Sequence, residues 1–193
     1  MKKDIILAGV GGQGILSIAT VIGEAAVAQG LFLKQAEVHG MSQRGGDVQS
    51  HLRLSDQPIA SDLIPEGKAH LIIAVEPMEA LRYLPWLAPE GWVITSTQPF
   101  INVPNYPDPE EIMTCIKQLN QYVAIDADKM AKEIGNARVT NMIVLGAASP
   151  YLDIPFDKLE QAIRTIFNRK GEDIVKLNIQ ALNSGRTFAE QRS

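Results

Sequence analysis

Glycines near the start of the chain have the spacing of loops that bind anions. Residues 5–16 read IILAGVGGQGIL, so a glycine-rich stretch separates an apolar run from a helical pattern. Glycines there let the backbone turn tightly and approach a ligand without Cβ clashes, and the following helix points unpaired N–H groups at the turn. We expect the turn either to bind a phosphate or similar anion, or to let strand and helix pack closely. Its candidate binding residues are Gly9, Gly11, Gly12, Gln13 and Gly14.

A second polar loop lies within residues 37–53, which read EVHGMSQRGGDVQSHLR. Arginine supplies a permanent planar cation that suits a carboxylate or a phosphate, and adjacent glycines let backbone N–H groups reach the same anion. We expect this loop to bind an anionic ligand, whereas the alternative is a solvated turn with a surface arginine. The candidate residues are Ser42, Gln43, Arg44, Gly45 and Gly46.

Other polar residues near these loops leave more than one role open. Glu37 ends an expected strand at roughly the distance, about 20 residues after a glycine turn, where dinucleotide-binding folds place a ribose-binding acid. His39 is either a hydrogen-bond donor at an active-site mouth or a structural histidine. Thr140 or Asn141 is expected to cap the apolar helix that follows. His51 is expected to be structural or interfacial, and His70 is expected to be structural.

Composition describes an ordinary globular protein. The chain has 193 residues, 46% of them hydrophobic, and a net charge of −4, so no overall basic surface favours nucleic acid or anionic membranes. The N-terminus, MKKDIILAG, is typical of a first strand in a cytoplasmic protein and not of a signal peptide. A single cysteine, Cys115, cannot form an internal disulfide or hold an iron–sulfur cluster, and we expect it to be a buried structural thiol.

Apolar strand patterns alternate with helical patterns over the first two thirds of the chain. This alternation predicts a single-domain α/β fold over residues 1–193, with a Rossmann-like, mostly parallel sheet. Residues 48–54 alternate differently and precede a turn, which indicates an antiparallel insertion. The chain after residue 126 is expected to be helical, and residues 187–193 are expected to be frayed or a docking extension. Strands are expected at 5–8, 31–37, 48–54, 71–75, 92–96 and 122–126, and late helices at 127–134, 141–148, 156–167 and 172–182.

Five stretches together carry a family resemblance that spans nearly the whole chain. They are GVGGQGI, EVHGMSQRGG, IPEGKAHLIIAVEPMEALRYL, ITSTQPF and TNMIVLGAAS. The chain resembles the gamma-type catalytic domain of the pyruvate/ketoisovalerate branch of 2-oxoacid:ferredoxin oxidoreductases. The version EVHGMSQRGG is most similar to the small beta subunits of the indolepyruvate-type enzymes.

The resemblance implies a subunit that is inactive alone and has no catalytic residue of its own. The assembled enzyme would decarboxylate aryl 2-oxoacids oxidatively with coenzyme A (CoA), giving acyl-CoA, carbon dioxide and reduced ferredoxin. A large alpha subunit would carry thiamine diphosphate and the iron–sulfur clusters and would pass electrons to ferredoxin. This chain would bind no cofactor or metal by itself, but would complete the active site and bind CoA or the substrate carboxylate. The resemblance also implies that Asn141 faces the ligand, and that Glu37 and His39 lie at the active-site mouth or an interface.

Three alternatives stay open from the residues themselves. The glycine turn and Glu37 also fit a free-standing NAD(P)-binding Rossmann oxidoreductase. A gamma subunit that acts on another 2-oxoacid would carry the same loops. A scaffold subunit whose glycine turns only allow close packing is the third.

Overall fold

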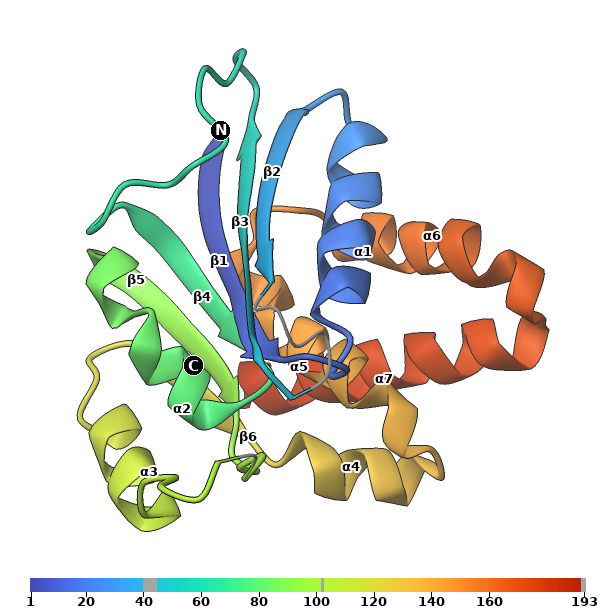
Figure 1. Cartoon of the computed structure of the whole chain (residues 1–193). Coiled ribbons are helices and arrows are strands. Elements are labelled where there is room, and N and C mark those ends of the chain that lie inside the picture. Colours follow the sequence, from blue (N-terminus) through green and yellow to red (C-terminus); the bar gives the residue numbers. More distant parts are fainter. Residues whose placement is uncertain (40–44, 102, 192–193) are drawn as a thin grey trace.

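A computed structural model describes residues 1–39, 45–101 and 103–191, and in these ranges the chain is an α/β fold (Figure 1). The strands of the described ranges form one six-stranded sheet in the order β2-β3-β1-β4-β5-β6. Their bounds are β1 (Lys2–Val10), β2 (Phe32–His39), β3 (Asp47–Ser55), β4 (Ala69–Ala74), β5 (Leu87–Ser96) and β6 (Tyr122–Ile125).

The central strands are parallel and buried on both faces, as their short apolar runs predict. Strands β1, β4, β5 and β6 run in one direction, whereas β3 is antiparallel to both β1 and β2. The predicted fold class is therefore confirmed, including the antiparallel insertion. This insertion lies inside the sheet, between β1 and the edge strand β2.

Helices cover both faces of the sheet (Figure 1). Helices α1, α5, α6 and α7 contribute to one large apolar core on one face, and α2 packs on β1, β4 and β5 across the other. The helix bounds are α1 (Ile15–Val27), α2 (Pro77–Arg82), α3 (Pro109–Lys117), α4 (Ala127–Ile134), α5 (Thr140–Ala148), α6 (Phe156–Phe167) and α7 (Glu172–Glu190), with short 3-10 helices at Leu84–Trp86, Ala137–Val139, Ser149–Tyr151 and Asn168–Lys170.

Two sequence-based expectations about packing are wrong. Helix α7 continues through Thr187 to Glu190, and Ala189 is 0% exposed, because the apolar stripe of this helix reaches the core at its last turn. Cys115 is exposed, because α3 buries only the narrow stripe of Ile112 and Ile116 and its cysteine lies beside that stripe.

Helices α5 and α7 cross with their backbones in direct contact. A Cβ atom built on Gly146 would lie 2.0 Å from the Leu182 carbonyl oxygen, and one built on Gly185 would lie 1.9 Å from the Ile143 carbonyl oxygen. These obstacles are backbone atoms, which cannot rotate away as a side chain could. The crossing therefore depends on glycine at both positions.

We expect Gly185→Ala to destabilise the protein severely although alanine favours helices. Overpacking costs typically 1–3 kcal/mol, and backbone contact puts this change at the upper end, about 3 kcal/mol. For a chain of this size that corresponds to a melting temperature lower by roughly 6–12 °C. The matched control is Thr187→Ala on an exposed position of the same helix. Equal melting temperatures for the two variants would contradict the backbone contact.

Candidate functional site

The predicted glycine turn lies at the carboxyl edge of the sheet, directly after β1. The chain leaves β1 through α1 toward β2 on one side, while β4 pairs with β1 on the other side. Ligands of open α/β sheets bind at such a reversal of strand order. Gly12 and Gly14 have φ of 102° and 79°, a region that side chains other than glycine rarely adopt. The turn therefore needs these glycines for its shape.

Side chains from both ends of the turn hold it in place. Gln13 accepts a hydrogen bond at Oε1 from the Val10 amide, at 2.8 Å. Asn141 donates from Nδ2 to the Gly14 carbonyl oxygen at 3.0 Å and accepts the Met142 amide at Oδ1. A Cβ atom on Gly14 would lie 2.5 Å from that Nδ2. Asn141 thus ties the start of α1 to the start of α5. The N-cap residue of α5 is Val139, which makes no side-chain capping hydrogen bond, and not Thr140 or Asn141 as expected.

The structure brings the two predicted glycine loops together. The Gly11 amide donates to the Gly46 carbonyl oxygen at 2.8 Å, and the Gly45 amide donates to the Gly11 carbonyl oxygen at 3.5 Å. These contacts continue the antiparallel pairing of β1 with β3 beyond Val10. The predicted residues Ser42, Gln43 and Arg44 lie outside the described residues, as does the side chain of His39, whose backbone ends β2.

A cavity of about 750 Å³ opens beside the turn, a volume typical of small-molecule sites. Turn residues Gly12 to Gly14 line it together with Asn141 and with Phe100 from the loop after β5. Three cationic side chains, which the sequence analysis did not single out, also line it; they are Lys132, Arg138 and Lys170. A cavity that combines backbone amides at a helix start with several cations is suited to a ligand that carries phosphate groups.

Short polar contacts order the wall of this cavity. Thr140 donates a hydrogen bond from Oγ1 to Oδ1 of Asp128 at 3.0 Å. This bond satisfies one acceptor of the carboxylate and joins α4 to α5. The ammonium group of Lys170 lies 5.2 Å from the centre of the Phe167 ring. Asn178 is largely buried, and its Nδ2 group donates a hydrogen bond to the Ile174 carbonyl oxygen.

Glu37 lines a second, smaller cavity of about 390 Å³ on the other side of the turn. Gly11, Gly12 and Gly14 border this cavity, together with Val48 of β3. Because β3 is inserted between β1 and β2, Glu37 is two strands away from β1 and not on its immediate neighbour. Glu37 and the glycine turn nevertheless share one cavity, as an acid that binds a ribose would require.

A buried carboxylate that the sequence analysis missed fastens the loop after β5. Glu76 follows β4, is fully buried, and accepts hydrogen bonds from the Glu79 amide, the Phe100 amide and the Tyr106 hydroxyl. Burial and the hydrogen bond to Glu76 raise the pKa of Tyr106, so its hydroxyl stays protonated and donates. The sequence Val-Glu-Pro at the strand end, with an acid directly after a buried strand, could have indicated this buried carboxylate.

The loop after β5, which Glu76 holds through Phe100 and Tyr106, carries exposed apolar side chains. Phe100, Ile101 and Val103 are 44%, 66% and 38% exposed. The described residues of the loop 97–106 therefore present apolar side chains beside the cavity, a surface that water disfavours.

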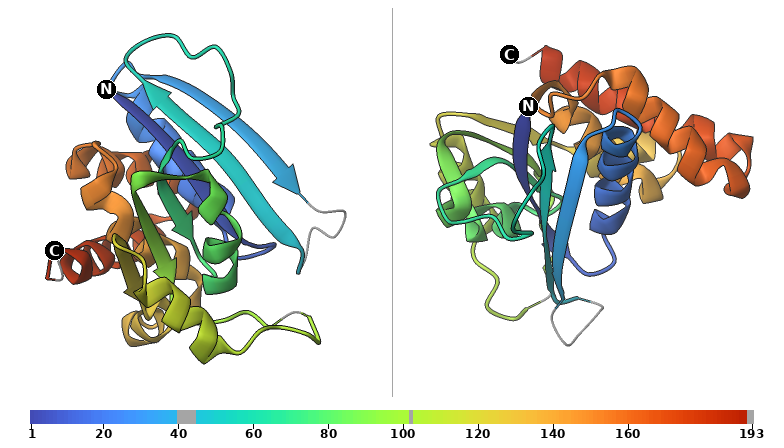
Figure 2. Two further views of the ribbon diagram at one scale, coloured as in Figure 1. Left: turned by 90° about the vertical axis from the view of Figure 1, so that its left-hand side faces the viewer. Right: turned by 90° about the horizontal axis from the view of Figure 1, so that it is seen from above.

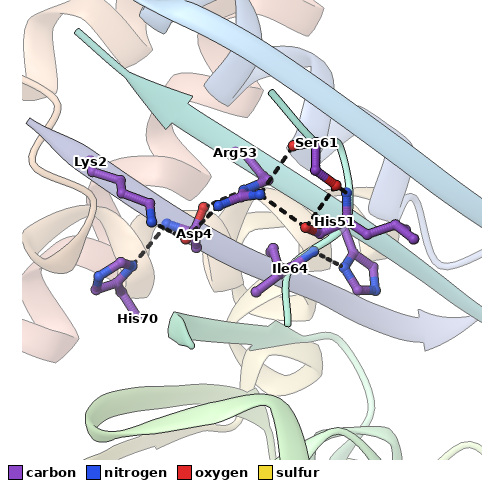
Figure 3. A network of polar contacts seen from close by, with 8 residues as sticks. Lys2, Asp4, His51, Arg53, Ser61, Ile64 and His70 are labelled. Atoms are coloured by element: carbon purple, nitrogen blue, oxygen red, sulfur yellow. Dashed lines mark hydrogen bonds and ion pairs between the residues drawn. The ribbon is translucent and has the colours of Figure 1, made fainter. Parts of the chain in front are cut away.

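His51 and His70 belong to a structural network on the opposite face of the sheet from α1 (Figure 3). The buried Asp4 forms an ion pair with the partly buried Arg53, with a 2.7 Å contact, and Arg53 also donates to the Ser61 carbonyl oxygen. Each histidine accepts a backbone amide at Nδ1: His51 from Ile64 at 2.9 Å, and His70 from Asp4 at 3.0 Å. The network pins residues 61–64 to the sheet. His70 has the structural role predicted for it, and His51 has the structural one of the two roles predicted for it.

Both histidines must be neutral to accept these bonds, which makes stability depend on pH. Burial lowers the pKa of His51 and of His70 below the ordinary 6.5. The unfolded chain therefore binds these protons at a higher pH than the folded chain. The contribution to stability is complete above that ordinary value and is lost as the pH falls through it.

We expect His51→Gln to reduce this pH dependence, because glutamine accepts a hydrogen bond but does not titrate. Urea unfolding at about pH 7.5 and 5.5 should show that the variant loses up to about 1 kcal/mol less on acidification than the parent, since one proton changes stability by at most about 1.4 kcal/mol per pH unit. Identical losses in parent and variant would contradict the role of His51.

Comparison with known proteins gives the family. Residues 4–188 match the family model of the pyruvate ferredoxin/flavodoxin oxidoreductases. The chain belongs to that family, and it is a subunit of a 2-oxoacid:ferredoxin oxidoreductase.

The curated relatives identify the branch. The indolepyruvate oxidoreductase subunit IorB of Archaeoglobus fulgidus is 38% identical over 96% of this chain and 94% of its own length, and IorB of Pyrococcus horikoshii is 36% identical over 99% and 98%. The resemblance to indolepyruvate ferredoxin oxidoreductase beta subunits, predicted from EVHGMSQRGG, is confirmed.

Solved structures share the fold. A keto/oxoacid ferredoxin oxidoreductase gamma subunit from Geobacter sulfurreducens superposes with a TM-score of 0.73 at 23% identity, covering 98% of this chain and 99% of that one. The 2-oxoglutarate:ferredoxin oxidoreductase of Magnetococcus marinus, solved with 2-oxoglutarate, coenzyme A and succinyl-CoA bound, gives a TM-score of 0.78 at 22% identity. This chain covers 31% of that longer chain, so it corresponds to about a third of it.

Two further findings concern metal ions and membranes. Among the described residues, no three His, Cys, Asp or Glu side chains are grouped as a metal site would require. In the same part of the chain, every helix is too short or too polar to cross a membrane.

Proposed function

We propose that this chain, as one gamma-type domain over residues 1–193, is the beta subunit of an indolepyruvate-type 2-oxoacid:ferredoxin oxidoreductase. The assembled enzyme converts an aryl 2-oxoacid and CoA into acyl-CoA, carbon dioxide and reduced ferredoxin. The observation that carries the proposal is the cavity in which the glycine turn meets Lys132, Arg138 and Lys170. The similarity to IorB subunits supports the choice of substrate class.

The ligand proposed for this cavity is CoA, whose phosphate groups require cations and backbone amides. The turn offers amides at the N-terminus of α1, and the three cations offer charge-assisted hydrogen bonds. Arg44, with Ser42 and Gln43, is proposed from the sequence to add a further anion contact, to CoA or to the substrate carboxylate. The CoA bound in the Magnetococcus marinus enzyme supports this choice of ligand.

The chemistry itself is proposed to take place on a large alpha subunit. That subunit would hold thiamine diphosphate and the iron–sulfur clusters and would reduce ferredoxin, which leaves this chain inactive alone. Its own residues bind and position the anionic reactants, the contribution that a protein makes to cofactor chemistry. The exposed loop 97–106 is proposed as the surface that the alpha subunit covers.

The cavity beside Glu37 favours a second candidate, binding of NAD(P) to the glycine turn. A carboxylate that shares a cavity with such a turn is suited to the hydroxyls of a ribose. Titration of the chain with NAD(H) and NADP(H) separates the candidates. Binding of either nucleotide that Glu37→Gln weakens supports the second, and binding of CoA alone supports the first.

We expect Arg138→Ala to weaken CoA binding by the chain in its complex. A hydrogen bond from a cation to a phosphate contributes about 1.5–3 kcal/mol, so the dissociation constant should rise about 10-fold or more. Isothermal titration with CoA and with dephospho-CoA measures the loss and identifies which phosphate is bound. The matched control is Arg164→Ala, an exposed arginine on α6 that does not line the cavity. Equal affinities for both variants and the parent would exclude this cavity as the CoA site.

We expect Ile101→Lys to weaken assembly with the alpha subunit, because a lysine charge would have to be buried in an apolar contact. Ile101 is 66% exposed, so the variant should keep the melting temperature of the parent. Sedimentation of mixed subunits measures assembly, and Val27→Lys, at a 56% exposed apolar position at the end of α1, is the control. If both variants assemble equally well, loop 97–106 is not the docking surface.

A further inference from the structure

Helix α7 contributes a buried amide side chain to the wall of the large cavity. This helix, red in Figure 2, packs with α6 on the face of the sheet that α1 covers. Asn178 of α7 lines the cavity beside the glycine turn, although the residue is only 7% exposed. Buried polar side chains are normally hydrogen-bonded, so both polar atoms of this amide should have partners.

The orientation of the Asn178 amide is fixed by its own helix. Nδ2 donates to the Ile174 carbonyl oxygen at 2.7 Å. A carbonyl oxygen only accepts hydrogen bonds, so the nitrogen must face Ile174 and the amide oxygen Oδ1 must face away from it. Oδ1 is therefore the atom that this side chain offers to another group.

The amide oxygen of Asn178 is available in the cavity. Within residues 1–39, 45–101 and 103–191, no backbone amide, hydroxyl or cationic side chain donates to it. It is also not a completely enclosed atom, so it reaches open space, and the open space that Asn178 lines is the cavity. Asn141, another largely buried asparagine of the cavity wall, uses both ends of its amide within the protein. Asn178 thus differs from Asn141 in having an acceptor left for a ligand.

The surroundings of Asn178 favour a ligand over water as the missing donor. Ile174 lies one helical turn earlier on the same face of α7, about 6 Å along the axis. It lines the cavity together with Leu177 and Phe167. A buried water molecule needs roughly two to four polar partners, which these apolar side chains do not supply. A ligand that fills the cavity can cover the apolar side chains and donate to Oδ1 at the same time.

We propose that Asn178 is a further binding residue for CoA, and that its Oδ1 accepts a hydrogen bond from an N–H group of this ligand. The inference rests on the proposed function of the cavity. CoA carries such donors in the amide groups of its pantetheine arm and in the amino group of its adenine base. Ionised phosphate oxygens are acceptors that Oδ1 repels, so the phosphates belong at the glycine turn and the cations.

This contact makes the cavity selective for a phosphate ligand that also carries a neutral N–H donor. A ligand that offers only negative charge satisfies the turn and the cations but leaves Oδ1 of Asn178 without a partner. Leaving a buried acceptor unsatisfied is more costly than a made hydrogen bond is favourable. Selection by the neutral donor is therefore separate from selection by charge, and a variant at Asn178 tests it alone.

The first test compares two asparagines of α7. Asn183 donates to the Ile179 carbonyl oxygen at 2.9 Å, the same bond to the residue four positions earlier, but it is exposed and does not line the cavity. In the assembled enzyme, Asn178→Leu should raise the dissociation constant for CoA about 10-fold, or about 1.4 kcal/mol, and Asn178→Ala should do the same. Asn183→Leu should leave it unchanged. Equal affinities for the parent and both Asn178 variants overturn the proposal.

Melting curves distinguish a binding role from a structural one. Leucine and alanine favour helices more than asparagine does, and the Ile174 carbonyl oxygen keeps its backbone hydrogen bond within α7. We therefore expect Asn178→Leu to melt no lower than the parent while it binds CoA more weakly. Melting temperatures that fall in both Asn178 variants and account for the lost affinity would make Asn178 a structural residue and overturn the proposal.

The second test identifies the donor and separates this inference from the proposed function. The parent and Asn178→Leu are titrated with CoA and with adenosine 3′,5′-bisphosphate, which keeps the base but lacks the pantetheine arm. A loss confined to CoA assigns the donor to the arm, an equal loss with both assigns it to the base, and either result supports the proposal. CoA binding that depends on Arg138 but not on Asn178 overturns this inference alone, whereas a parent that binds no CoA overturns the proposed function as well.

Discussion

The candidate site depends on one close contact between segments far apart in the chain. The Asn141 amide group bonds the Gly14 carbonyl oxygen at 3.0 Å and occupies the space that a side chain on Gly14 would need. This contact joins the start of α1 to the start of α5. Because the cavity lies between these helices and α4 and α7, its shape follows from that contact.

Close contacts that only glycine allows also occur behind the site. Helix α5 can cross α7 backbone to backbone because Gly146 and Gly185 have no side chains. On the sheet side, the Gly11–Gly46 hydrogen bond extends the β1–β3 pairing into the turn. Glycines, which have no side chain, thus determine the position of the site on its helix side and on its sheet side. The cations of the site lie on surface helices around it.

Much of this arrangement could be predicted from the sequence. The apolar runs and helical stripes predicted each strand and the late helices, because local periodicity determines which residues can face a core. The sequence also placed the glycine turn between β1 and α1. It did not reveal Lys132, Arg138 or Lys170, because surface cations have no distinctive pattern and their convergence depends on how α4, α5 and α7 pack. Cys115 was wrongly expected to be buried, because its helical spacing matches the apolar stripe but α3 covers little of the sheet.

We propose above that this chain completes an active site by binding CoA at the glycine turn. An experimentally determined structure of the chain with its large subunit and CoA tests this most directly. We expect phosphate density within hydrogen-bonding distance of the backbone at Gly12 to Gly14 and of at least one of Lys132, Arg138 and Lys170. CoA bound in that complex with no contact to any of these residues would contradict it.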